Sequence, residues 1–185
     1  MKTSNIILIS FFSVIGIFLL SLMIQAEPKK VDYNRPMGQM KTETHTLPKF
    51  SHLKVGRGCY LLYTQANGDS IHYSYPQETK FEKPVFEVRG DTLFVRNSGQ
   101  KNLSAINVYA SSVNSIRVDS SHFEITAANT PALHISAKTS TVKFQGNTII
   151  DTAYLKLKDC TLLGSQAKIK KLETEMDHVE IRYDR

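Results

Sequence analysis

The side chains that most often bind metals are scattered along this chain of 185 residues. The six histidines are His45, His52, His72, His122, His134 and His178. None has a second histidine two or four residues away, the spacing at which one strand or helix presents both imidazoles to a metal ion. We therefore predict no metal site, and we interpret His122 and His178, which each precede a predicted strand, as exposed polar residues.

The carboxylates of the C-terminal half are also isolated. Enzymes that cleave polysaccharides on a β-helix need clustered acidic residues as general acid and base. The candidates are Asp119, Glu124, Asp151, Asp159, Glu173, Glu175 and Asp177. The last three alternate, but they lie at the last predicted coil beside Lys170 and Lys171. No phosphate-binding loop, nucleophile elbow or dinucleotide-binding motif occurs, so we predict no catalytic, cofactor-binding or metal-binding residue.

Two further features have simple structural explanations. Cys59 and Cys160 show no CxxC pattern, and we predict two unpaired thiols that are buried as small apolar groups. Arg89-Gly90-Asp91 matches the integrin-recognition tripeptide, but Gly-Asp is also a pair that tight turns favour. We favour the turn.

The formal net charge of +6 is spread along the chain. Nucleic-acid binding usually requires a clustered basic face, ideally interleaved with aromatic residues. Here the basic residues alternate with apolar ones. We therefore predict no nucleic-acid partner.

An uncharged apolar segment extends from Ile6 to Ile24. About 20 helical residues span the core of a bilayer, so the segment can form one transmembrane helix. A cleaved signal peptide is the alternative, with Ala26 as its last residue. The branched Ile24 would then occupy position −3 from the cleavage site, where small residues are favoured. We predict that residues 1–26 are a retained membrane anchor. Residues 27–48 are polar, contain three prolines and predict a linker.

The orientation of the anchor follows from two opposing features. Lys29, Lys30 and Arg35 on its C-terminal flank slightly favour a cytoplasmic C-terminal side. The very short N-terminal tail before an export-like segment favours the opposite. We predict a single-pass inner-membrane protein whose C-terminal domain faces the periplasm or the exterior.

Apolar-x-apolar triplets recur throughout residues 49–185, for example Leu53-Lys54-Val55 and Leu155-Lys156-Leu157. Each triplet predicts a strand with its two apolar side chains in the core and the middle one in water. Helical spacing of apolar residues is almost absent. The sequence therefore predicts an all-β domain.

The triplets form two series with a spacing of about 17–22 residues, which is typical of stacked repeats. The first series begins at Ile116, Leu133, Leu155 and, more weakly, Leu172; the second begins at Phe123, Val142, Cys160 and Val179. We predict a β-solenoid in which each coil supplies one strand of each series, and the strands of one series stack on one another. Glu124 and Lys143 would then be outward neighbours of opposite charge.

The region from Phe50 to Val108 has longer strands and turn signals. Asn67-Gly68 predicts a two-residue hairpin turn between residues 60–64 and 71–75, and Gly90-Asp91 predicts another. We expect a β-hairpin or sheet region that caps the N-terminal end of the solenoid.

Three features together resemble a known family. They are Phe50-x-x-Leu53-x-Val55-x-x-Gly58, then Tyr60-Leu61-Leu62, then Val88-x-Gly90-Asp91-Thr92-Leu93-Phe94-Val95. In these features and the strand triplets that follow, the chain resembles Gram-negative auto-transporter adhesins with a head GIN domain, although the Gly-Ile-Asn element is absent. The resemblance implies a right-handed β-helix-like fold and, less firmly, adhesion.

These observations favour a non-catalytic interaction or structural protein of the cell envelope, with adhesin-like character and a protein or glycan partner. A carbohydrate-processing β-helix enzyme is the alternative.

Overall fold

The computed structural model describes residues 40–76, 83–97 and 105–183. They form eleven strands: β1 (Met40–Thr46), β2 (His52–Val55), β3 (Tyr60–Gln65), β4 (Ser70–Pro76), β5 (Val85–Arg89), β6 (Thr92–Arg96), β7 (Ile106–Ala110), β8 (Ser115–Asp119), β9 (His122–Lys138), β10 (Thr141–Gly164) and β11 (Lys168–Tyr183). Within these ranges no helix is long and apolar enough to cross a membrane. The segment Ile6–Ile24, predicted as an anchor, lies outside the described residues.

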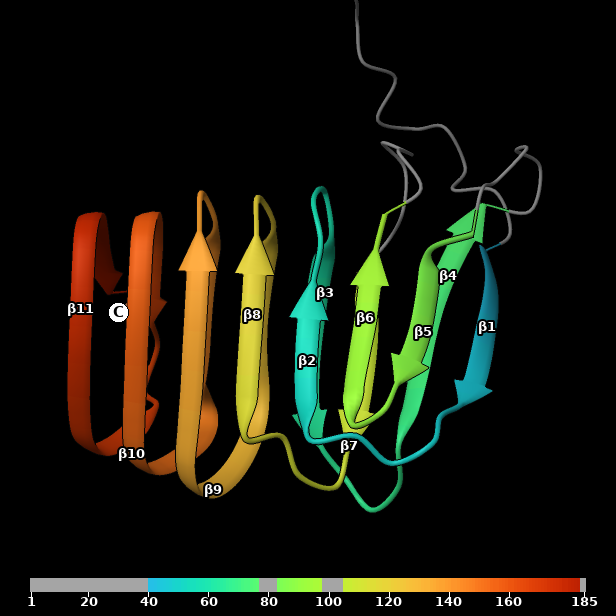
Figure 1. The fold of residues 1–185 in the computed structure, drawn as a ribbon, viewed down its shortest axis with the longest axis horizontal. Coiled ribbons are helices and arrows are strands. Elements are labelled where there is room, and N and C mark those ends of the chain that lie inside the picture. The colour runs from blue at the N-terminus through green and yellow to red at the C-terminus, as the bar shows by residue number, and fades with distance from the viewer. Residues whose placement is uncertain (1–39, 77–82, 98–104, 184–185) are drawn as a thin grey trace, which may run out of the picture. The chain divides into compact units, whose positions relative to one another are not determined.

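All eleven strands belong to one mixed sheet that curls around a single core (Figure 1). Neighbouring strands follow the order β1-β4-β7-β3-β9-β8-β2-β6-β5, and β10 pairs with both β9 and β11. The sheet curls because β9 bends: its first part pairs with β3, and its last part pairs with β8. The described residues are therefore all-β, as predicted, and form a curled half-barrel.

The tight bends along one edge of the sheet share an unusual backbone conformation. We call this row of bends the corner edge. Their central residues have positive φ, namely Gly58 (72°), Ser120 (50°), Thr139 (50°), Asp159 (52°) and His178 (52°). The last four follow one another at intervals of 19 or 20 residues. Backbone hydrogen bonds join successive bends, from Gly58 N to Ser120 O (3.0 Å), from Ser120 N to Lys138 O (2.9 Å) and from Thr139 N to Lys158 O (2.9 Å).

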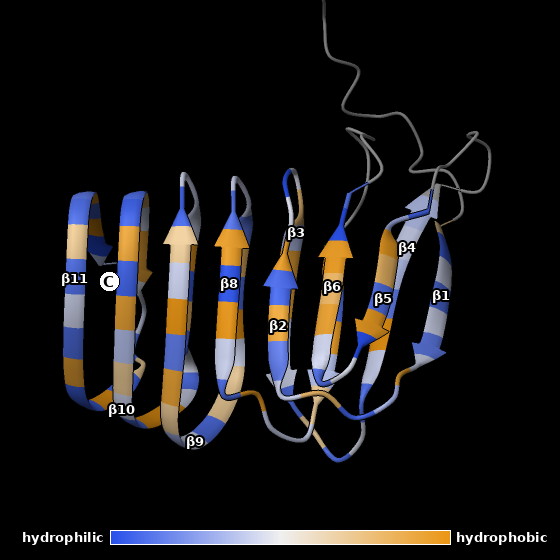
Figure 2. Cartoon of the chain, in the orientation of Figure 1, coloured by the Kyte–Doolittle hydropathy of each residue, from blue (hydrophilic) through white to orange (hydrophobic). Residues whose placement is uncertain are grey.

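The alternation of apolar and polar residues marks the inside and outside of the sheet (Figure 2). Leu133, Ile135, Leu155 and Leu157 are each at most 2% exposed, whereas Lys156 is exposed. Full burial of such a side chain stabilises the fold by about 1.5–3 kcal/mol relative to exposure. The prediction that these four residues share one core is confirmed.

The predicted alignment of the first series is wrong by two residues. Ile116 lies beside Ile135, and Ile135 lies beside Leu155. A shift of two residues leaves every side chain on its face of the sheet, so apolar alternation alone cannot detect it. The bends set the alignment, because each of these three residues lies four positions before a residue with positive φ.

The second series is aligned as predicted at both ends. Phe123 lies beside Val142, and Cys160 lies beside Val179. Between them, the hydrogen bond from Thr161 N to Ser140 O (2.9 Å) places Leu162, rather than Cys160, beside Val142.

One predicted hairpin forms and the other does not. Strands β5 and β6 are antiparallel, with Arg89 opposite Thr92, so Gly90-Asp91 is a two-residue turn. By contrast, β7 lies between β3 and β4, so Asn67-Gly68 does not join paired strands. Gly68 has the positive φ that the turn signal requires, but β7 packs its fully buried Ile106 and Val108 into the gap.

The polar stretch predicted as a linker is also partly a strand. Residues 40–46 form β1, which pairs antiparallel with β4. Three threonines, which favour strands, alternate with charged or polar side chains here. An edge strand with so few apolar residues gives no core pattern in the sequence, and the linker prediction therefore extended too far.

Candidate functional site

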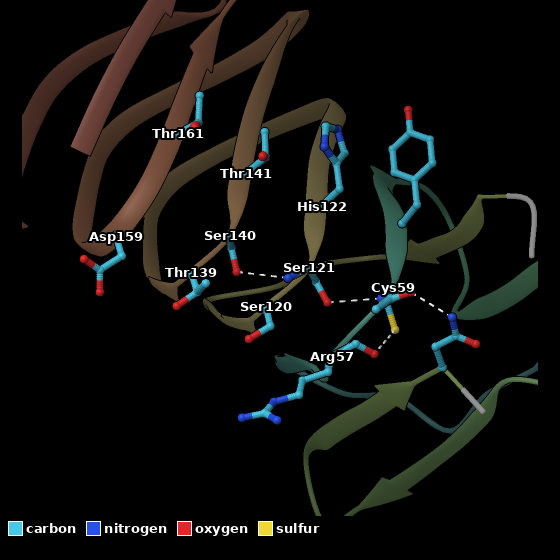
Figure 3. Close-up of a pocket in the computed structure, with 13 residues that line it drawn as sticks. Arg57, Cys59, Ser120, Ser121, His122, Thr139, Ser140, Thr141, Asp159 and Thr161 are labelled. Carbon is cyan, nitrogen blue, oxygen red and sulfur yellow. Dashed lines mark hydrogen bonds between the residues drawn. The ribbon is translucent and has the colours of Figure 1, made fainter. Parts of the chain in front are cut away.

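A groove of about 930 Å³ follows the corner edge (Figure 3). Its lining comes from the bends and from the first residues of β3, β9 and β10. The lining residues are Arg57, Gly58, Cys59, Tyr60, Asn97, Ser120, Ser121, His122, Thr139, Ser140, Thr141, Asp159 and Thr161. Because the bends stack, equivalent positions form rows across the strands.

The innermost row consists of the buried residues Cys59, Ser121, Ser140 and Cys160. The Ser121 and Ser140 hydroxyls accept hydrogen bonds from Cys59 N (3.1 Å) and Ser121 N (3.2 Å). The same hydroxyls donate to Gly56 O (2.5 Å) and Lys138 O (2.7 Å). These hydroxyl groups therefore tie together the bends at Gly58, Ser120 and Thr139.

The two cysteines lie at opposite ends of this row and are free, as predicted. Each thiol lies near the carbonyl oxygen two residues earlier, Arg57 O (4.0 Å) for Cys59 and Lys158 O (3.0 Å) for Cys160. Burial raises the pKa of Cys59 to about 11. Because the thiolate is the reactive form, this side chain is a poor nucleophile at neutral pH.

The outer row presents polar side chains to the groove. It consists of Tyr60, His122 and Thr141, the first residues of β3, β9 and β10, and of Thr161, where the end of β10 curls back beside its start. The Tyr60 and His122 rings are in edge contact, with centroids 4.6 Å apart and planes at 87°. Arg57 and Asp159 add a cation and a carboxylate to the lining (Figure 3).

Glu124 lies beneath the outer row and is almost completely enclosed, with 3% of its side chain exposed. Its carboxyl group accepts hydrogen bonds from the Tyr60 hydroxyl (3.0 Å) and from the Gln145 amide. Lys143 Nζ lies 3.8 Å from the same group. The predicted pairing of Glu124 with Lys143 is confirmed, but the predicted exposure of Glu124 is wrong, because Tyr60 and Gln145 cover it.

Two neighbouring groups respond to this environment. Burial lowers the pKa of His122 more than the nearby Glu124 carboxyl group raises it, so the imidazole is neutral at pH 7. Burial and the hydrogen bond to Glu124 raise the pKa of Tyr60. The groove thus offers a neutral imidazole and a neutral phenol beside the threonine hydroxyls.

The hydrogen bonds at the groove argue against nucleophilic catalysis. An activated serine donates its proton to a general base such as histidine. Ser121 and Ser140 donate to backbone carbonyl oxygens instead. The groove is therefore equipped to form hydrogen bonds with a ligand rather than to attack one.

A second hollow, of about 570 Å³, lies on the outer face of β8–β11. His134 and Tyr154 stack there with ring centroids 4.3 Å apart. Its charges are largely matched across strands, because Lys156 pairs with Glu175 (2.8 Å), and Lys158 beside the hollow pairs with Asp177 (2.9 Å). Such exposed pairs keep the face soluble and contribute little to stability.

The sequence predicted no site residue, and the groove was missed because its lining comes from hydroxyl groups rather than from a motif. A signal was nevertheless present. Ser120-Ser121, Thr139-Ser140-Thr141 and Asp159-Cys160-Thr161 repeat small polar residues after successive strands. In the described part of the chain, no group of three His, Cys, Asp or Glu side chains could hold a metal ion.

Comparison with known proteins supports the fold. A candidate lipid-binding protein from Parabacteroides distasonis matches with a TM-score of 0.54 and 13% identity, over 79% of this chain and 67% of the other. At that identity the likeness is one of fold alone.

Two weaker matches are a candidate adhesin from Bacteroides fragilis and a candidate cell-adhesion protein from Clostridium sporogenes. The first has a TM-score of 0.45 at 12% identity, over 79% of this chain and 97% of the other. The second has a TM-score of 0.39 at 9% identity, over 78% and 99%. No family model and no curated protein matches the chain, so the head GIN resemblance stays a prediction.

Proposed function

We propose that this protein is a non-catalytic, adhesin-like interaction module of the cell envelope, and that its corner-edge groove binds a glycan. The curled sheet is then a short right-handed β-solenoid with the antiparallel strands at its N-terminal end. Ile6–Ile24 holds it in the inner membrane, with the folded domain in the periplasm or outside the cell.

The observation that carries the glycan proposal is the repetition of hydroxyl groups along the groove. Thr141 at the start of β10 and Thr161 near its end occupy equivalent positions, because β10 curls back beside its own start. Adjacent backbone segments of a sheet lie about 4.8 Å apart. A regular array of donors and acceptors suits a polymer whose own hydroxyl groups repeat. The polar lining favours a sugar over an acyl chain, although a chain of similar fold is described as lipid-binding.

The non-catalytic part of the proposal is supported by the enclosed Glu124 and by the serine hydroxyls that donate to the backbone. A glycosidase needs one carboxyl group to protonate the leaving oxygen and a second to activate water or attack the sugar. Glu124 cannot reach a sugar while Tyr60 and Gln145 cover it.

A screen of envelope glycans and short-chain phospholipids against the full chain in detergent tests both the glycan binding and the lack of catalysis, if binding and turnover are measured together. We expect glycan binding without product formation. Turnover that Asp159→Asn or Glu124→Gln abolishes would establish the carbohydrate-processing alternative. Binding of phospholipid alone that Thr141→Val with Thr161→Val weakens would make the ligand a lipid, because these changes leave binding through the anchor unaffected.

A further inference from the structure

The two ends of the curled sheet differ. At the N-terminal end, β1 and β5 are edge strands, but aromatic side chains close the core beside them, with Tyr73 only 1% exposed and its ring 6.3 Å from that of Phe86. At the other end, β11 pairs with β10 and with no other strand of the described residues. Its second edge therefore leaves backbone N–H and C=O groups without strand partners, as any edge strand does.

Two aliphatic side chains of β11 are also half exposed, while Ile169, Met176 and Val179 pack partly against the core. Leu172 and Ile181 are each 49% exposed, whereas Ala153 and Leu162, their neighbours on β10, are 0% and 8% exposed. A groove of about 240 Å³ opens beside these residues of β10 and β11. Its apolar lining includes Phe144, Leu155, Leu162, Ile169, Leu172 and Ile181.

The charges of β11 indicate what covers this end. Its first part carries Lys168, Lys170 and Lys171, and its middle part carries Glu173, Glu175 and Asp177. Two copies of β11 side by side in parallel would place like charges together. An antiparallel arrangement brings the lysine segment of one copy to the acidic segment of the other, and such cross-strand pairs stabilise a sheet.

From these observations we propose that the protein forms a two-fold symmetric homodimer through its C-terminal end, in which two β11 strands pair antiparallel. The contact is isologous, so it closes at two copies and does not propagate into a fibre. Leu172 and Ile181 become buried against the partner copy. This proposal does not depend on what the corner-edge groove binds.

Charge reversal on the exposed side chains of β11 tests the proposal. One variant is Lys170→Glu with Lys171→Glu, and the other is Glu173→Lys with Glu175→Lys. Among the described residues, these four side chains form surface ion pairs with Asp151, with each other and with Lys156. Such pairs contribute little to stability, so we expect both variants to fold. Sedimentation of the full chain in detergent over a range of concentrations gives the dissociation constant.

We expect the unmodified chain to dimerise, and each variant alone to dissociate at least about tenfold more readily, because like charges then face each other. An equimolar mixture of the two variants should recover dimers. Leu172→Asp should also dissociate the dimer, whereas Val85→Asp, at a residue 44% exposed on β5, should not. A monomeric unmodified chain, or a mixture that does not recover dimers, overturns the proposal.

Discussion

Glu43 is a surface carboxylate held by several donors at the N-terminal end of the core. The Tyr73 and Tyr75 hydroxyls each donate to it at 2.7 Å, and Lys83 Nζ lies 3.0 Å away. The hydrogen bond from Tyr73 is the largest of several that lower the pKa of Glu43 to about 2. A carboxyl group whose pKa falls on folding stabilises the fold above its unfolded pKa.

This interaction predicts an acid-dependent loss of stability. Above the ordinary glutamate pKa of 4.5, Glu43 should contribute fully, and its contribution should fade as the pH falls toward 2. Glu43→Gln should therefore lower the thermal midpoint at pH 7, and the difference from the unmodified chain should shrink below pH 4.5. Thermal unfolding at several pH values measures this. The exposed Glu175→Gln is the control, and a Glu43→Gln difference that does not vary with pH would contradict the prediction.

The alternation along β10 predicts opposite effects for two adjacent residues. Leu155 is 2% exposed and Lys156 is exposed. Leu155→Ala should cost about 2–5 kcal/mol of unfolding free energy, because it removes buried carbon and leaves a cavity. Lys156→Ala should change it by less than about 0.5 kcal/mol. Chemical denaturation of both variants provides the comparison, and similar losses would show that the two faces are not inside and outside.

At the scale of elements, the strands could be predicted and their alignment could not. The triplets around Leu133 and Leu155 identify two buried strands, but the alternation repeats every two residues and cannot fix which residues lie side by side. The alignment depends on the bends at Thr139 and Asp159, where the backbone has positive φ. Threonine is rarely found in that conformation. Neither bend carries the glycine or asparagine that would have marked it in the sequence.

The bends therefore predict reciprocal effects on stability. Gly58 adopts a φ of 72°, and a β-branched residue there is strained by about 1–2 kcal/mol. Gly58→Thr should destabilise the chain by that amount. Thr139→Asn should be neutral or stabilise it by up to about 1 kcal/mol, because asparagine tolerates this conformation better than threonine. Urea denaturation tests both, and a stabilising Gly58→Thr would show that the bends are not strained.

At the scale of the whole molecule, the fold class could be predicted and the order of strands in its N-terminal part could not. Asn67-Gly68 is a strong local turn signal, yet β7 separates β3 from β4. That insertion depends on long-range packing of Ile106 and Val108, which no local pattern reports. The groove as a whole could not be predicted for the same reason. Small polar residues recur at about 19-residue spacing along part of its rows, but only the curled sheet brings Tyr60 beside His122.

The proposed anchor makes a separate prediction. If Ile6–Ile24 is retained, N-terminal sequencing of the protein purified from membranes should give the residues before Ile6. Alkaline carbonate should leave the protein in the membrane fraction, because a spanning helix is not extracted with peripheral proteins. A mature chain that begins at Glu27 would identify the segment as a signal peptide.

The most direct test of the central claim uses the glycan that the screen identifies. It measures the affinity of groove variants for that glycan. Thr141→Val with Thr161→Val removes two hydroxyl groups and keeps the shape of both side chains, and Ser136→Ala on the outer face of β9 is the matched control. We expect the double variant to bind about tenfold more weakly, as the loss of two hydrogen bonds implies, with the control unchanged. Equal affinities of the double variant and the unmodified chain would show that the groove is not the binding site.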